Sequence, residues 1–176
     1  RVVVWSRTRE RAEGLAADLR GAARPTAIDV VASPREVVEE ADVVCTLTPS
    51  VEAIVEGAWL HPGQHLNVVG ARPRADEREV DGEAMARSSI WVDDRATART
   101  KSGDLLRAID EGAISEADIV GTIGEVVAGR ARGRTSSEEI TLFDSVGIGA
   151  QDVAVADVFI RAARAQGLGT TVDLSA

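Results

Sequence analysis

Three side chains suited to binding an anion follow the first apolar segment of the chain. Ser6, Arg7 and Thr8 come directly after the β-branched run from Val2 to Trp5, and a helical pattern begins at Thr8. Hydroxyl groups, a guanidinium and the N–H groups at a helix start all favour an anion such as phosphate. In nucleotide-binding α/β folds, an acid after the second strand binds the adenosine ribose, whereas an arginine accommodates a 2′-phosphate. Judged alone, the segment is also typical of a helix cap with a solvated arginine.

Polar or small residues also follow three later apolar strands. They are Thr46-Leu47-Thr48, Gly70-Ala71 and Asp93-Asp94. Ligands of parallel sheets bind at the carboxyl ends of the strands, so these residues are candidates for one site. Adjacent residues at a strand end point apart, so we expect one of the two aspartates to cap the next helix rather than both to bind a metal. No GxGxxG turn, which would hold a pyrophosphate, occurs in the chain.

Strands alternate with helices along most of the chain. Strand patterns cover residues 2–5, 27–31, 42–48, 66–71, 90–92 and the segment from Ile140, and helical patterns cover residues 8–19, 33–41, 79–87, 103–111 and 152–166. Nearly continuous apolar strands separated by helices predict an α/β fold whose sheet is mostly parallel and carries helices on both faces. The last helix has few polar residues, so we expect it to be buried against a partner chain or a segment outside this sequence.

Composition narrows the class of protein. The net charge of −9 argues against nucleic-acid binding, which needs a basic excess. The apolar runs are shorter than the roughly 18 residues that span a bilayer, so no membrane association is expected. A single cysteine, Cys45, excludes an internal disulfide framework and favours the cytoplasm. His61 and His65 flank a Pro-Gly turn without other ligands at metal spacing, so no metal site is predicted.

Several segments, in order, resemble the ornithine cyclodeaminase/mu-crystallin family. They read VVVWSRTRERAEGLA, ADVVCTLTPS, WLHPGQHLNVVGA, REVDGEAM, SGDLLRAIDEG, IGEVVAGRARGRTSSEEITLFDSVGIGAQDVA and GLGTTVDL, and together they cover essentially the whole chain. Family members carry a substrate and dimerisation domain and then a Rossmann domain. The resemblance implies that residues 1–150 form a Rossmann-like, doubly wound NAD(P)-binding domain that lacks its first strand and glycine-rich turn. Residues 151–176 would form a helix and a strand that return toward the missing domain.

The resemblance also implies an activity for the complete protein. Family members transfer hydride at the α-carbon of an amino acid or cyclic imine, as cyclodeaminases, ketimine reductases or an alanine dehydrogenase. We expect a homodimer formed through the missing domain, and an inactive chain when this segment stands alone. NADP(H) is favoured over NAD(H) because no acid accompanies Arg7. The alternative is a mu-crystallin-like, NADP(H)-dependent protein that binds a small ligand without relevant turnover.

The family pattern can be carried over residue by residue. It implies that Ser6, Arg7 and Thr8 contact the adenosine ribose. The nicotinamide half would be lined by Thr46, Leu47, Thr48, Val69, Gly70, Ala71 and Ser145. Cyclodeaminases carry a catalytic Asp after the small residue that follows the strand-end Gly, but that position is Arg72 here. Asp76, in the same loop, is the other candidate, and the catalytic residues are otherwise unknown.

Overall fold

The computed structural model describes residues 1–22 and 27–173, and the chain divides into two compact units at Val146 and Gly147. The predicted boundary at residue 150 therefore falls inside the first turn of α7 (Gly149–Gln166). The first unit contains the strands and all the predicted site residues.

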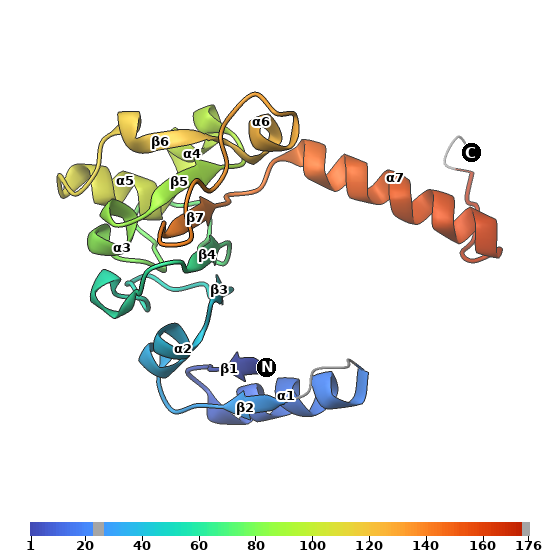
Figure 1. Ribbon diagram of the computed structural model, residues 1–176. Coiled ribbons are helices and arrows are strands. Elements are labelled where there is room, and N and C mark those ends of the chain that lie inside the picture. The colour runs from blue at the N-terminus through green and yellow to red at the C-terminus, as the bar shows by residue number, and fades with distance from the viewer. Residues whose placement is uncertain (23–26, 174–176) are drawn as a thin grey trace. The chain divides into compact units, whose positions relative to one another are not determined.

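The described strands form two sheets, and every pairing is parallel, as the apolar patterns predict. β1 (Val2–Val4) pairs with β2 (Ile28–Val30). The other five strands form a sheet with the order β3-β4-β7-β5-β6, and Figure 1 shows these strands side by side. Its strands are β3 (Val43–Thr46), β4 (His65–Val68), β5 (Ser89–Val92), β6 (Ile119–Thr122) and β7 (Thr141–Asp144).

Helices connect these strands. They are α1 (Arg9–Ala22), α2 (Pro34–Glu40), α3 (Gly82–Ala86), α4 (Arg95–Lys101), α5 (Gly103–Asp110) and α6 (Ile123–Val127), with 3-10 turns at Gly57–Trp59 and Glu116–Asp118. Ser33 caps α2 and Asp94 caps α4, each accepting a backbone N–H two or three residues into the helix. Gly112, with a φ of 73°, follows the end of α5.

Four expectations about these elements need correction. The sequence patterns missed α4, β6 and α6, because elements this short show too little periodicity. The predicted helix from residue 79 instead begins at Gly82, with Asp81 as its cap. Glu79 lies before it with a fully buried carboxylate, which an apolar pattern cannot distinguish from a helical position.

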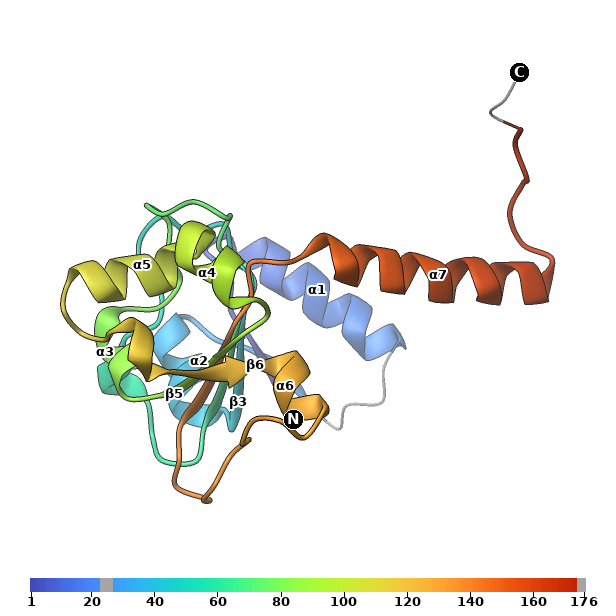
Figure 2. The ribbon, with the colours of Figure 1, turned by 90° about the horizontal axis from the view of Figure 1, so that it is seen from above.

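The core lies on one face of the five-stranded sheet, where the strands pack against the helices between α2 and α5. Its largest buried side chains include Leu66, Met85, Ile90, Leu105 and Leu142. The opposite face is partly open, as a groove of about 420 Å³ lined by strand residues and by α6. Figure 2 shows α6 beside the end of β6, away from α4 and α5. The prediction of helices on both faces of the sheet is therefore only partly confirmed for the described residues, because α6 lines the groove on the second face.

The second unit leaves its apolar side chains exposed. In α7, Val153, Val158 and Phe159 are 71%, 59% and 70% exposed. The contact predicted for this helix, with a partner chain or with a segment outside this sequence, stays a prediction. Residues 167–173 form no strand, because no neighbouring strand pairs with them, and residues 174–176 lie outside the described residues.

We predict that Gly103→Ala destabilises the fold, because α5 begins against the loop that precedes α3. A Cβ at Gly103 would lie 1.9 Å from the carbonyl oxygen of Glu77 and 2.5 Å from that of Arg74. The free energy of unfolding should fall by about 1–3 kcal/mol, the usual cost of overpacking. The control is Gly14→Ala in α1, where nothing lies within 4 Å. That control should raise stability by about 0.5–1 kcal/mol through helix propensity. Urea denaturation measures both, and a Gly103→Ala variant as stable as the parent would refute the tight contact.

Candidate functional site

The carboxyl ends of β1 and β3 meet around a cavity of about 300 Å³. Five of the predicted cofactor-binding residues line it: Ser6, Arg7, Thr8, Leu47 and Thr48. β1 and β3 belong to different sheets, but the segments that follow their carboxyl ends face the same cavity. The Ser6 hydroxyl accepts a hydrogen bond from the N–H of Thr8 at 3.3 Å, so a local turn orients this segment.

Arg11, which the sequence reasoning missed, lines the same cavity. Arg7 lies just before α1 and Arg11 lies in its first turn, and both residues line the cavity. Neither arginine pairs with a carboxylate of the described residues, whereas Arg9 between them pairs with Glu13 at 2.8 Å. The cavity therefore carries two uncompensated cations, and the four-residue spacing is a signal that could have identified the second.

The other predicted cofactor-binding residues gather at the ends of β4 and β7. Val69 follows β4 and its N–H donates to the carbonyl of Thr46 at 3.2 Å. Gly70 lies so close to the loop after β3 that an added Cβ would be 2.1 Å from the nitrogen of Thr48. Ser145 follows β7 and its N–H donates to the carbonyl of Val68 at 2.9 Å. The predicted residues thus lie along one edge, and their contact with a cofactor stays a prediction.

One buried carboxylate joins the loops after β3 and β4. Glu79 is 0% exposed, and its Oε2 accepts from the hydroxyl of Thr46 at 2.7 Å and from the N–H groups of Gly70 and Ala71 at 2.7 and 3.2 Å. Its Oε1 accepts from the N–H and the hydroxyl of Thr48 at 2.6 and 2.7 Å. Sequence reasoning missed Glu79, because its partners are eight to 33 residues away.

A second buried acid holds the backbone of Glu79 in place. Asp104, in the first turn of α5, accepts from the N–H groups of Glu79 and Val80 at 2.7 and 2.9 Å. Burial raises the pKa of Asp104 to about 6, although these two hydrogen bonds oppose the rise. The carboxylate of Glu79 is therefore anchored through its own backbone to a helix of the core.

The end of β7 carries a carboxyl group that is protonated at neutral pH. Asp144 is 2% exposed, and the hydroxyl of Ser102 donates to its Oδ2 at 2.6 Å. Burial above all, and next the negative charge of Asp104, raise the pKa of Asp144 to about 8. Ser145 donates from its hydroxyl to Asp93 at 3.0 Å, so the predicted site serine is fixed by a neighbouring acid.

The loop between β4 and α3 presents no catalytic base at the position of the family Asp. Arg72 is bound by both oxygens of the buried Glu77, at 2.6 and 2.7 Å. The hydrogen bond that Arg72 donates to Glu77 raises the pKa of Arg72 above its already high value. Asp76 is exposed, and its backbone carbonyl accepts from Arg107 of α5 at 3.3 Å.

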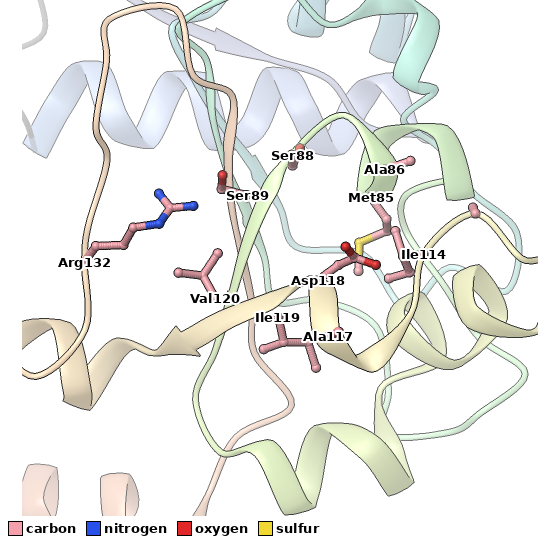
Figure 3. A pocket seen from close by; sticks show the side chains of 11 residues that line it. Met85, Ala86, Ser88, Ser89, Ile114, Ala117, Asp118, Ile119, Val120 and Arg132 are labelled. Carbon is pink, nitrogen blue, oxygen red and sulfur yellow. The ribbon is translucent and has the colours of Figure 1, made fainter.

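A larger cavity, of about 560 Å³, lies at the opposite, amino end of β5 and β6 (Figure 3). Its polar side chains are already bound within the protein. Ser89 and Arg132 both donate to Glu139, at 2.5 and 2.9 Å, and Asp118 accepts from Ser115. None of the predicted site residues lines this cavity, and we assign it no ligand.

Two kinds of site find no support in residues 1–22 and 27–173. No three acidic, histidine or cysteine residues are grouped so as to hold a metal ion. No helix of this part is long and apolar enough to cross a membrane.

Comparisons with known proteins match most of the chain. The sequence profile of the ornithine cyclodeaminase/mu-crystallin family matches residues 1–166. The ketimine reductase mu-crystallin of Rattus norvegicus is 40% identical over 155 residues, which are 88% of this chain and 45% of that protein. The chain thus spans about half the length of the curated relatives that it matches.

Solved structures share the fold at high similarity. The Δ1-pyrroline-2-carboxylate reductase of Thermococcus litoralis, in complex with NADH and L-proline, is 33% identical with a TM-score of 0.89, over 97% of this chain and 52% of that one. An archaeal alanine dehydrogenase dimer with bound NAD is also 33% identical, with a TM-score of 0.86 over 98% of this chain and 52% of that one.

We predict that Asp144 makes the fold less stable as the pH rises. Its pKa is about 8 when folded and 3.8 as a free side chain, so the folded state keeps a proton that the unfolded state releases. Its contribution to the free energy of unfolding is complete below about pH 4 and falls by about 1.4 kcal/mol per pH unit up to pH 8. The Asp144→Asn variant has no titrating group at this position and lacks this decrease. The free energy of unfolding of the variant, minus that of the parent, should therefore increase from pH 5 to pH 8. Urea denaturation at several pH values tests this, and a difference that does not change with pH would refute it.

Proposed function

The chain belongs to the ornithine cyclodeaminase/mu-crystallin family, and we propose that it supplies most of the NAD(P)-binding part of an oxidoreductase. Its substrate would be an amino acid or a cyclic imine that reacts at the α-carbon. The observation that carries the proposal is the gathering of the residues after β1, β3, β4 and β7 at one edge, beside two unpaired arginines. Because the chain spans about half of its relatives, the activity, substrate and homodimeric state of the complete protein are all proposals.

The residues of the edge suit the two ends of a dinucleotide. Ser6, Arg7 and Thr8, with Arg11, would hold the adenosine end, because cationic and hydroxyl groups line that cavity. The loops at residues 46–48 and 69–71, with Ser145, would line the nicotinamide end. The bound cofactor would supply hydride exchange, and the protein would align its reactive carbon with the substrate.

We assign NADP(H) as the preferred cofactor. The cavity after β1 contains no carboxylate that would bind a ribose 2′-hydroxyl, and its two free guanidinium groups favour a 2′-phosphate. The two solved relatives hold NADH and NAD, so this preference rests on Arg7 and Arg11 of this chain.

The chain also suits a larger assembly. An apolar cavity of about 390 Å³ separates β1 from β3, with Val2, Val4 and Val44 among its lining. We propose that a further parallel strand, from the missing part of the Rossmann domain, lies there. The exposed apolar side chains of α7 would pack against the substrate and dimerisation domain.

The identity of residue 72, an arginine, favours one of the family's reactions over another. A guanidinium bound by Glu77 cannot accept a proton at neutral pH, and its charge disfavours a nearby cationic imine. We therefore favour reduction of a preformed imine over cyclodeamination, which needs a base at this position. The same feature keeps the second candidate open, namely a mu-crystallin-like protein that binds NADP(H) and a small ligand without turnover. Turnover of a cyclic ketimine separates the two.

The cofactor preference predicts the effect of single arginine substitutions in the complete protein. Arg7→Ala and Arg11→Ala should each weaken NADPH binding by about 1.5–3 kcal/mol, the scale of a charge-assisted hydrogen bond, and leave NADH binding nearly unchanged. Arg9→Ala removes the same charge from the same helix but lies outside the cavity and should change neither. Titration of nicotinamide fluorescence measures all of these. Equal NADPH and NADH affinities in the parent, unaltered by Arg7→Ala, would contradict the assignment.

The loop after β4 predicts which reaction is fast. The complete protein should oxidise NADPH with a cyclic ketimine much faster than it converts ornithine to proline. Asp76→Asn should leave ketimine reduction unchanged, because Asp76 is exposed and only its backbone carbonyl has a described contact. Robust proline formation that survives Asp76→Asn would show that our interpretation of Arg72 is wrong.

A further inference from the structure

We propose that Glu79 is a positioning residue that fixes the distance between the two loops of the nicotinamide half. This inference rests on the proposed function, because it assigns those loops to the cofactor. It concerns a residue that neither the sequence patterns nor the family resemblance assigns to the site.

Glu79 has no remaining capacity to bind a substrate. A carboxylate offers about four lone-pair positions, and five donors already surround this one. All five come from the predicted cofactor-binding residues Thr46, Thr48, Gly70 and Ala71. The group therefore acts on the loops rather than on the reacting atoms.

Glu79 is also the bridge between loops that otherwise separate. The last ladder hydrogen bond between β3 and β4 runs from the N–H of Val69 to Thr46. Beyond it, no other hydrogen bond of the described residues joins residues 47–48 to residues 70–71. Gly70 and Thr48 approach each other so closely that a Cβ would not fit, so a carboxylate must hold two backbones in contact.

The carboxylate can set this distance because its own backbone cannot move freely. Asp104 accepts from the N–H of Glu79, and the carbonyl of Glu79 accepts from the N–H groups of Ile54 and Val55 at 2.8 and 3.0 Å. Both the N–H and the carbonyl of Glu79 are thus fixed by hydrogen bonds, so the position of its carboxylate determines where the two loops lie.

Glu79→Gln keeps the size of the side chain and changes one acceptor oxygen into a donor NH₂ group. That NH₂ must face either the N–H of Thr48 or the N–H groups of Gly70 and Ala71. Two donors repel, so one of the loops is released. Ser6, Arg7 and Arg11 of the adenosine cavity make no hydrogen bond with Glu79, so the groups that would hold a 2′-phosphate should be unaffected, although Thr48 also lines that cavity.

The test uses the complete protein with NADPH and a cyclic ketimine. The compound 2′-phospho-ADP-ribose, which lacks the nicotinamide, serves as a probe of the adenosine end. We expect Glu79→Gln to bind the probe as the parent does and to lower kcat by roughly tenfold to a hundredfold, the cost of misplaced reactants. NADPH can be labelled with deuterium on either face of nicotinamide C4. The parent should transfer deuterium from one labelled form only, whereas Glu79→Gln should transfer it from both. Thr46→Val, which removes one donor, should change the same properties less.

Glu139→Gln is the matched control. Glu139 accepts from Ser89, Arg132 and Thr135 at the amino end of the sheet, so its loss should lower stability without changing kcat or the face of transfer. Parental kcat and a single transfer face in both Glu79→Gln and Thr46→Val would overturn the positioning role. Equal changes in Glu79→Gln and Glu139→Gln would overturn it as well. A parent protein that binds neither NADPH nor the probe would instead overturn the proposed function, and the inference with it.

Discussion

A carboxylate without a cationic partner can remain inside a protein only where hydrogen-bond donors surround it, and this constraint organises the edge of the sheet around Glu79. The donors come from the ends of β3 and β4, so those two strands must end at the same level. Gly70 must lack a side chain because the loops then touch. Asp104 carries the constraint into α5, whose first residue, Gly103, has no room for a Cβ.

The acids near this edge avoid repelling one another by three different means. Glu77 is neutralised by Arg72, Glu79 is solvated by neutral donors, and Asp144 keeps its proton because burial raises its pKa to about 8. At the neighbouring cavity, Arg7 and Arg11 have no carboxylate partner among the described residues. An anionic group is therefore attracted to the adenosine end of the proposed site.

Local patterns predicted most elements of the first unit and some of its details. One of the pair Asp93 and Asp94 was expected to cap a helix, and Asp94 does so, because a cap depends on hydrogen bonds within three residues. The same reasoning failed for β6 and for the start of α3, where the pattern is short or a buried acid interrupts it. The last helix was recognised as too apolar for solvent, and Val153, Val158 and Phe159 of α7 are exposed.

The sequence by itself determined the alternation of strands and helices, the parallel sheet and the position of Ser6, Arg7 and Thr8 directly after the first strand, because each depends on residues close together in the chain. Only the tertiary structure decided that Arg72 is held by a buried acid, that Asp144 keeps a proton and that Glu79 joins two loops. Those properties depend on burial and, for Glu79, on partners that the pairing of β3 with β4 brings together. No local pattern of residue types encodes the distance between such groups or the water they lose on folding.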